Sequence, residues 1–134
     1  MQAFQLIQNL SKNNSVTLIT SNSKNKKKYE LYKQIEIMRV NTPKRLVKLR
    51  RLSFCIKSYI LSLKDSFDIV LGNDWHGAFP AVLHSKIKNE YSITYFHGMG
   101  ALISYKKLFA KILLKISDEV LANSHEQIKY LRRL

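Results

Sequence analysis

Cysteine is nearly absent from this sequence of 134 residues, which contains only Cys55. A single cysteine cannot form a disulfide within the chain, and no second cysteine or suitably spaced histidine suggests a structural zinc site. His76 and His84 lie eight residues apart, too far for the i, i+4 spacing of a metal-binding pair on a helix. The sequence therefore predicts no metal site, and its one thiol suits a reducing cytoplasm.

Acidic residues are also scarce, since nine Asp and Glu stand against 23 Lys and Arg, which gives a formal net charge of +14. A field of this sign favours polyanions such as nucleic acid, anionic lipid headgroups or sugar phosphates. The sign alone does not choose among them. Lys, Asn, Ile and Ser are all abundant, so the codon usage of an AT-rich genome explains the charge equally well.

Long apolar runs are missing. No uninterrupted run approaches the roughly 18 residues that a membrane span needs, and no basic-then-apolar signal sequence opens the chain. We therefore expect a cytoplasmic protein that is soluble, or peripheral at the inner face of the membrane. With 46% hydrophobic and 24% charged residues, the composition is that of one folded domain over residues 1–134.

Several catalytic motifs are missing as well. No nucleophile elbow of the form G-x-S-x-G, no phosphate loop ending in Gly-Lys-Ser/Thr and no G-x-G-x-x-G follows any predicted strand. The usual support for a hydrolase, a nucleotide triphosphatase or a dinucleotide-dependent redox enzyme is therefore absent. We expect no cofactor.

The patterns that are present alternate between strand and helix. Strands are predicted at 16–20, 35–40, 67–72, 92–96 and 119–123, with helices at 2–12, 44–64, 78–88, 105–116 and after 124. Residues 35–40 alternate apolar and polar side chains, which indicates a strand near a sheet edge, whereas 67–72 are typical of a central strand. This order predicts an α/β fold, with a Rossmann-like parallel sheet of about five strands covered by helices on both faces.

The segment 44–64 is the longest amphipathic helix that the sequence predicts. Its apolar side chains share one face, while basic residues such as Arg50, Arg51 and Lys57 lie elsewhere. We expect the apolar stripe to pack against the sheet and the basic residues to attract an anionic membrane surface. The stripe consists of Leu46, Leu49, Leu52, Ile56, Tyr59, Ile60 and Leu63.

Three polar clusters follow predicted strands, at 73–77, 97–100 and 123–125. In an open parallel sheet the ligand crevice lies beyond the carboxyl ends of the strands, so these clusters are expected to converge. His97 and Gly98 would set an imidazole where glycine lets a ligand approach the backbone closely. Each cluster alone also has a structural interpretation, because Asp, Asn, His and Gly are ordinary turn residues.

The motifs resemble a known family. Phe67-Asp68-Ile69-Val70, then Asn73-Asp74-Trp75-His76, resembles the amino-terminal domain of family-4, glycogen-synthase-like glycosyltransferases. Ile93-Thr94-Tyr95-Phe96-His97-Gly98 is similar to that family's strand ending in histidine. The segment 117–124, Ser-Asp-Glu-Val-Leu-Ala-Asn-Ser, is similar to its Ala-Asp-x-Val-Ile-Ala-x-Ser segment. The resemblance covers residues 16–134.

The resemblance implies half of a two-domain, GT-B-fold sugar transferase that retains the anomeric configuration, with most members needing no metal. By matching position, His97 would contact the donor sugar near the reacting centre, and Gly98 would be a substrate-binding residue. The acceptor side would be lined by Asp74, Trp75 and His76. Asn123 and Ser124 would lie at the rim of the cleft. The expected substrates are a nucleotide-sugar donor and a glycan or lipid-linked acceptor.

The sequence also departs from the family. It starts within the helix that would follow the family's first strand and Gly-Gly loop, and it stops before a donor-binding domain. We therefore expect an incomplete amino-terminal, acceptor-side domain that is inactive alone and needs a donor-binding domain or subunit. The alternative is a basic peripheral membrane- or nucleic-acid-binding module without catalysis. The dispersed lysines and the lack of a binding motif argue against nucleic acid.

Overall fold

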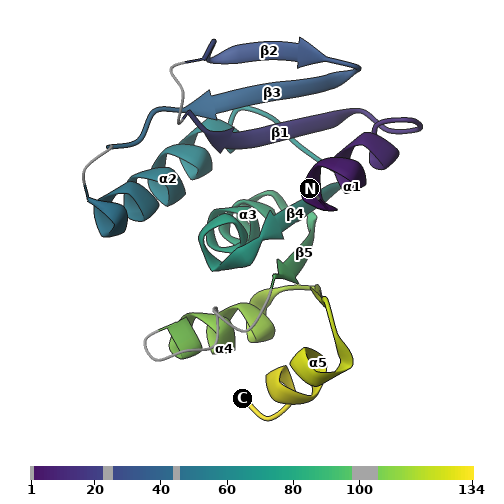
Figure 1. Cartoon of the computed structure of the whole chain (residues 1–134), viewed down its shortest axis with the longest axis vertical. Coiled ribbons are helices and arrows are strands. Elements are labelled where there is room, and N and C mark those ends of the chain that lie inside the picture. Colours follow the sequence, from purple (N-terminus) through teal and green to yellow (C-terminus); the bar gives the residue numbers. More distant parts are fainter. Residues whose placement is uncertain (1, 23–25, 44–45, 98–105) are drawn as a thin grey trace. The chain divides into compact units, whose positions relative to one another are not determined.

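The computed structural model describes residues 2–22, 26–43, 46–97 and 106–134. These residues form helices and strands that alternate from β3 (Ile35–Val40) onward, which confirms the α/β class (Figure 1). The elements are α1 (Gln2–Leu10), β1 (Val16–Ser21), β2 (Tyr29–Tyr32), β3 (Ile35–Val40), α2 (Val47–Ser62), β4 (Ile69–Asn73), α3 (Asp74–Lys88), β5 (Tyr91–Phe96), α4 (Lys106–Ile116), β6 (Glu119–Ala122) and α5 (His125–Leu131).

The chain divides into two compact units, residues 1–54 and 55–134, with α2 beginning in the first and ending in the second. Each unit contains one three-stranded sheet among the described residues, whereas the sequence predicts a single sheet of about five strands. In the second unit the parallel strands β4, β5 and β6 are joined through α3 and α4, which is the Rossmann-like arrangement, whereas β1 and β3 of the first unit are joined through β2.

In the first unit β3 lies between its two neighbours, in the order β1-β3-β2 (Figure 1). It runs parallel to β1 and antiparallel to β2. The prediction that 35–40 lie near a sheet edge is wrong, because the short strand β2, which the sequence pattern did not reveal, pairs with the other side of β3. The connecting turn places Lys33 and Gln34 at φ 46° and 64°.

In the second unit the parallel order β4-β5-β6 makes β5 the middle strand. Ser92, Thr94 and Phe96 of β5 are buried. The sequence predicts a central strand at 67–72, but within the described residues β4 pairs only with β5. Ile69 and Leu71 are accordingly 59% and 38% exposed.

Helix α3 packs directly on β4 and β5. The approach is close because Gly72 of β4 has no side chain, and a Cβ added there would lie 2.2 Å from Cα of Ala78. Helix α3 begins at Asp74, so the polar segment 73–77, predicted as a loop, is the end of β4 and the first turn of the helix. The core of this unit consists of Ala78, Val82, Phe96, Ala110, Leu113 and Leu131.

Helix α2 reverses the orientation that the sequence predicts. Its buried residues are Ser58 and Ser62, while Leu49, Leu52, Ile56 and Ile60 are between 51% and 57% exposed. The Ser58 and Ser62 hydroxyls donate to the carbonyls of Cys55 and Tyr59 at 3.2 and 2.8 Å. Hydroxyls that bond within their own helix can be buried without an unpaired donor, so the serine face can pack inward.

None of the helices in the described part of the chain combines the length and the hydropathy that crossing a bilayer requires.

Candidate functional site

The residues that follow β4, β5 and β6 converge in the second unit. The backbone N–H of His97 donates to Oδ1 of Asp74 at 3.0 Å. Nδ2 of Asn123 lies 3.1 Å from Nδ1 of His97. The sequence predicts this convergence at the carboxyl ends of the strands, and for these three residues the structure confirms it.

Asp74 is held in an uncommon backbone conformation. It is the first residue of α3 and has a φ of 53°, in the left-handed region that residues other than glycine rarely adopt. Such a conformation costs on the order of 1 kcal/mol and persists where surrounding contacts enforce it. Its half-buried carboxylate accepts the His97 N–H at the start of a helix, where the helix dipole favours negative charge.

The side chain of His97 is oriented by Tyr95 and Asn123. The Tyr95 hydroxyl donates to Oδ1 of Asn123, which turns the amide N–H₂ of Asn123 toward Nδ1 of His97. Nδ1 therefore accepts, and the neutral imidazole carries its proton on Nε2. The Tyr95 ring lies 4.4 Å from the imidazole, centroid to centroid, with 58° between the ring planes.

Nε2 of His97 is buried, and it has no hydrogen-bond partner among the residues that the structure describes. Buried polar atoms of native proteins are nearly always paired, so an unpaired one beside a strand end is a candidate contact for a ligand. With the proton on Nε2, this atom can donate to a ligand oxygen.

Asn123 is fixed in turn by the start of α5. Its backbone N–H donates to Oε1 of Gln127 at 3.1 Å, and the Gln127 N–H donates to Oγ of Ser124 at 3.2 Å. Ser124 is thus the N-cap of α5, as its sequence predicts. The predicted role of Ser124 at the cleft rim stays a prediction.

Sequence analysis missed Tyr95 and Gln127 as site residues. Tyr95 lies on β5 two residues before His97, which directly follows that strand, and a period of two places both side chains on one face. Gln127 stands three residues after Ser124, the spacing of a capping box. Both signals were present in the sequence, but only the contacts reveal that they support His97.

Trp75 and His76 contact one another and the helices around them. Their rings stack at 4.2 Å with 15° between the planes, and Trp75 also stacks on Phe109 of α4 at 5.4 Å. The His76 carbonyl accepts from Sγ of Cys55 at 3.2 Å. Burial raises the pKa of Cys55, which keeps its thiol neutral. The predicted acceptor-side role of Asp74, Trp75 and His76 stays a prediction, and Gly98 lies outside the described residues.

Asp118 aligns the strands on which the site depends. Its carboxylate accepts from Nζ of Lys86 at 2.7 Å, and from the backbone N–H and hydroxyl of Ser92 at 2.8 and 2.6 Å. The hydrogen bonds from Lys86 and then Ser92 hold the pKa of Asp118 well below its usual range. These bonds connect α3, the start of β5 and the residue before β6.

Across residues 2–22, 26–43, 46–97 and 106–134, no group of three or more His, Cys, Asp or Glu side chains could hold a metal ion.

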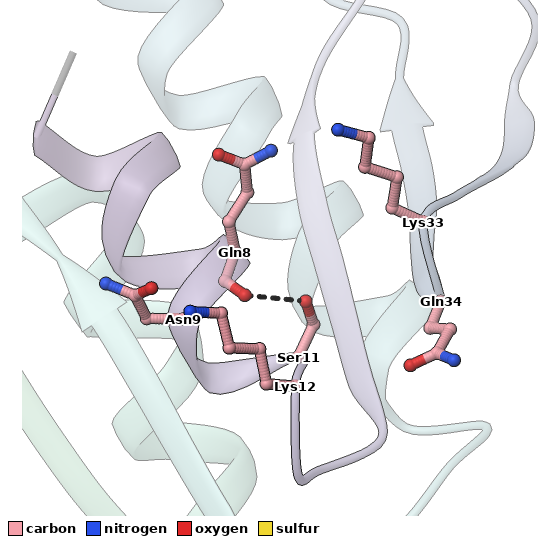
Figure 2. Close-up of a pocket in the computed structure, with 6 residues that line it drawn as sticks. All are labelled: Gln8, Asn9, Ser11, Lys12, Lys33 and Gln34. Atoms are coloured by element: carbon pink, nitrogen blue, oxygen red, sulfur yellow. Dashed lines mark hydrogen bonds between the residues drawn. The ribbon is translucent and has the colours of Figure 1, made fainter.

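The first unit has a separate hollow of about 490 Å³ between the end of α1 and the β2–β3 turn. Figure 2 shows its polar lining, within which the Ser11 hydroxyl donates to the Gln8 carbonyl at 3.0 Å. The hollow lies near the amino ends of β1 and β3, the opposite end from the ligand crevice of an open parallel sheet. It therefore does not have the position expected of a transfer site. The lining residues are Gln8, Asn9, Ser11, Lys12, Lys33 and Gln34.

Comparison with known proteins identifies the family of the chain. The family model for Glycosyltransferase Family 4 matches residues 1–134. The chain belongs to glycosyltransferase family 4, and corresponds to the amino-terminal domain of such enzymes. No curated protein matches it.

Among solved structures, the chain is similar to a sucrose-phosphate synthase from Thermosynechococcus elongatus. The TM-score is 0.75 at 16% sequence identity, and the match covers 98% of this chain and 76% of the other. At this identity the likeness shows the fold alone, which is the Rossmann-like fold of the GT-B class.

Proposed function

We propose that the chain is the acceptor-side half of a retaining glycosyltransferase, which transfers a sugar from a nucleotide-sugar donor to a glycan or lipid-linked acceptor. The observation that carries this proposal is the arrangement of Asp74, His97 and Asn123, with a buried Nε2–H left unpaired among the described residues. It lies where open parallel sheets bind their ligands, in a chain that belongs to a sugar-transferase family.

In this proposal His97 is the catalytic residue, and its Nε2–H donates to an oxygen of the donor sugar near the reacting carbon. Asn123 fixes the tautomer of His97 through its hydrogen bond to Nδ1, and Asp74 fixes the His97 backbone by accepting its N–H. A hydrogen-bond donor that is already oriented and desolvated stabilises the charge that develops in the transition state without having to reorganise. Such a contact is strongest in a site from which water is excluded. Asp74, Trp75 and His76 line the acceptor side, and excluded water favours transfer over hydrolysis.

We further propose that residues 1–134 do not transfer sugar by themselves and that a donor-binding domain or subunit completes the site. The resemblance assigns the groups that bind the diphosphate to that domain. Isothermal titration with UDP- and GDP-sugars is therefore expected to show no tight binding. A dissociation constant in the low micromolar range for any of them would contradict this part of the proposal.

Transfer itself is testable by supplying a family-4 donor domain as a second polypeptide, with labelled nucleotide sugars and glycan or lipid-linked acceptors. We expect transfer only when both polypeptides are present, and nuclear magnetic resonance of the product should show a retained anomeric configuration. An inverted product would refute the retaining mechanism. Transfer by residues 1–134 alone would refute the need for a partner.

We propose a cytoplasmic location, peripheral at the inner face of the membrane. Cell fractionation tests this, since the protein should divide between the cytosol and a membrane fraction from which salt removes it. The competing function is a non-catalytic basic module that binds nucleic acid or membranes. Salt-dependent binding to random duplex DNA would favour the nucleic-acid form of that alternative.

A further inference from the structure

The hollow of the first unit differs in its chemistry from the site around His97, because only polar side chains line it. Its volume of about 490 Å³ lies within the roughly 300–1,000 Å³ of small-molecule sites. The end of α1 and the two residues after it line one side, and the β2–β3 turn lines the other with Lys33 and Gln34 (Figure 2). All of these residues belong to the unit 1–54, so the hollow lies within one compact part of the chain.

The helical side of the hollow is fixed by hydrogen bonds. Ser11 is buried, and its backbone N–H and hydroxyl donate to the carbonyls of Ile7 and Gln8, each at 3.0 Å. The backbone N–H of Lys12 donates to the Asn9 carbonyl at 3.4 Å. Because these bonds hold the chain at the end of α1, the side chains that line this side of the hollow project from a defined backbone.

The opposite side is formed by a strained turn. Tyr32 pairs with Ile35, so Lys33 and Gln34 are the whole connection between β2 and β3, and their φ angles are 46° and 64°. Two-residue turns with positive φ favour Asn-Gly or Asp-Gly, because residues with long side chains rarely adopt this region. Backbone strain of this kind gathers at ligand-binding positions. The turn thus places an ammonium group and a carboxamide at the hollow, where the favoured glycine would offer no side chain.

The lining combines two ammonium groups and three carboxamides with no carboxylate. In the described part of the chain, none of the three carboxamides hydrogen-bonds to another residue, and neither ammonium group forms an ion pair. Nζ of Lys33 lies 5.6 Å from the centroid of the Tyr32 ring, a cation–π contact that leaves its charge intact. The hollow therefore carries positive charge and several polar groups that are available to a ligand.

Each of these groups indicates a part of the ligand. Ammonium groups favour an oxyanion, and carboxamides, which both donate and accept hydrogen bonds, match the hydroxyls of a sugar. None of the described residues that line the hollow is aromatic, so it offers no ring on which a nucleobase could stack. These features favour a saccharide that carries an oxyanion over a nucleotide.

We propose that this hollow is a second carbohydrate site, which binds a saccharide unit bearing a phosphate or carboxylate group. Lys12 and Lys33 attract the oxyanion, and the three carboxamides bind the sugar hydroxyls. The site is separate from the proposed transfer site, because it adjoins the amino ends of β1 and β3, whereas the residues around His97 follow the carboxyl ends of β4, β5 and β6. It needs neither a nucleotide-sugar donor nor a donor-binding domain.

The test is a ¹H–¹⁵N NMR titration of the 134-residue chain with glucose-6-phosphate, glucuronate, glucose and inorganic phosphate. The first two ligands distinguish phosphate from carboxylate as the preferred oxyanion. We expect at least one of them to bind with a dissociation constant of about 1 mM and to shift the side-chain amide resonances of Gln8, Asn9 and Gln34. Glucose and inorganic phosphate should bind at least about tenfold more weakly, because each lacks half of the matching groups. Binding of neither anionic sugar would overturn the proposal.

Lys12→Gln with Lys33→Gln should weaken binding of the anionic sugar about tenfold or more. The matched control, Lys64→Gln with Lys88→Gln, removes the same two charges from exposed positions outside the hollow and should change the affinity less than about twofold. Circular dichroism and urea midpoints verify folding, which is expected because all four lysines are exposed. Equal weakening by the two double variants would mean attraction by net charge alone, and undiminished binding by the first would mean that its lysines do not contact the ligand; either result would overturn the site.

Gln34→Gly separates ligand binding from the shape of the turn. Glycine adopts positive φ freely, so this variant should have a higher urea midpoint than the parent. It should also bind the anionic sugar about threefold or more weakly, because one carboxamide is missing. Inorganic phosphate that binds as tightly as the sugars would indicate an anion site only, and shifts confined to residues around His97 would place the sugar at the transfer site. Either outcome would overturn the proposal, as would unchanged affinity of Gln34→Gly.

Discussion

Gly72 occupies a position that no side chain fits. A Cβ there would lie 2.2 Å from Cα of Ala78, so Gly72→Ala must push α3 away from β4. We expect a loss of about 1–3 kcal/mol in the free energy of unfolding, the usual cost of overpacking a rigid contact. Urea unfolding of the variant measures it.

Gly77→Ala is the matched control for this prediction. A Cβ at Gly77 would lie 4.0 Å from the nearest backbone atom, which is an ordinary contact. Alanine inside a helix is favoured over glycine by roughly 0.5–1 kcal/mol, so this variant should be as stable as the parent or slightly more stable. Equal destabilisation by both substitutions would show that the close approach at Gly72 is not the cause.

His97 should matter for transfer rather than for folding. His97→Ala, assayed with the donor domain supplied, is expected to lower turnover about a hundredfold or more, the effect of removing one preorganised transition-state contact. Its urea midpoint should change little, since the residue is only half-buried. His125→Ala, which alters an exposed residue at the start of α5, is the control. Full activity of His97→Ala would show that His97 has no catalytic role and is only a turn residue.

Asp118 should make the stability of the chain sensitive to acid. Because the folded state holds the pKa of Asp118 below its ordinary value of 3.8, its stabilising contribution is complete above that value. As the pH falls through 3.8 and toward the lower folded pKa, protonation weakens the bonds from Lys86 and Ser92, and the contribution is lost.

The measurement compares urea midpoints of the parent and Asp118→Asn at about pH 7, 4 and 3. Asp118→Asn should be less stable than the parent at neutral pH, and the difference should shrink as the pH falls. Asp65→Asn replaces another exposed carboxylate and should show no such convergence. A constant difference across the pH range would contradict the assignment.

At the scale of elements, a buried pair joins α3 to the strands it covers. Nε2 of His84 lies 2.8 Å from Oε2 of Glu90, whose other oxygen accepts the Phe67 N–H at 2.7 Å. His84 is fully buried and Glu90 nearly so, with 7% of its side chain exposed. The pair therefore fixes the segment before β4 and the one before β5 to the end of α3.

Glu90→Ala should be strongly destabilising because it leaves both a buried imidazole nitrogen and a backbone N–H without their acceptor. Each such group costs about 1–3 kcal/mol, so we expect a loss of about 2–5 kcal/mol in chemical denaturation. Glu119→Ala, at an exposed position of β6, should cost far less. A similar loss from both variants would mean that the buried pair contributes little.

At the scale of the whole molecule, the limited strand pairing in the two sheets should lower the stability of the chain. In the described part of the chain, β1 pairs only with β3 and β4 pairs only with β5, and two aliphatic side chains of β4 are exposed. We expect a marginally stable chain, with thermal unfolding below about 60 °C. Calorimetry tests this, and a single cooperative transition above that temperature would contradict it.

The sequence by itself determined the α/β class, most of the strand and helix positions and the three polar clusters, because these depend on local periodicity and on turn-forming residues. It placed Asp74, His97 and Asn123 at strand ends, and parallel strands bring such ends together. These features need no knowledge of which strands are neighbours.

Tertiary structure decided what depends on contacts between distant residues. Strand order is one case, since β3 became central only by pairing with the unpredicted β2. The orientation of α2 is another: periodicity identifies an apolar face, but whether that face or the serine face packs inward depends on what surrounds the helix. The tautomer of His97 is the third, because it follows from a bond between Tyr95 and Asn123, 28 residues apart in the chain.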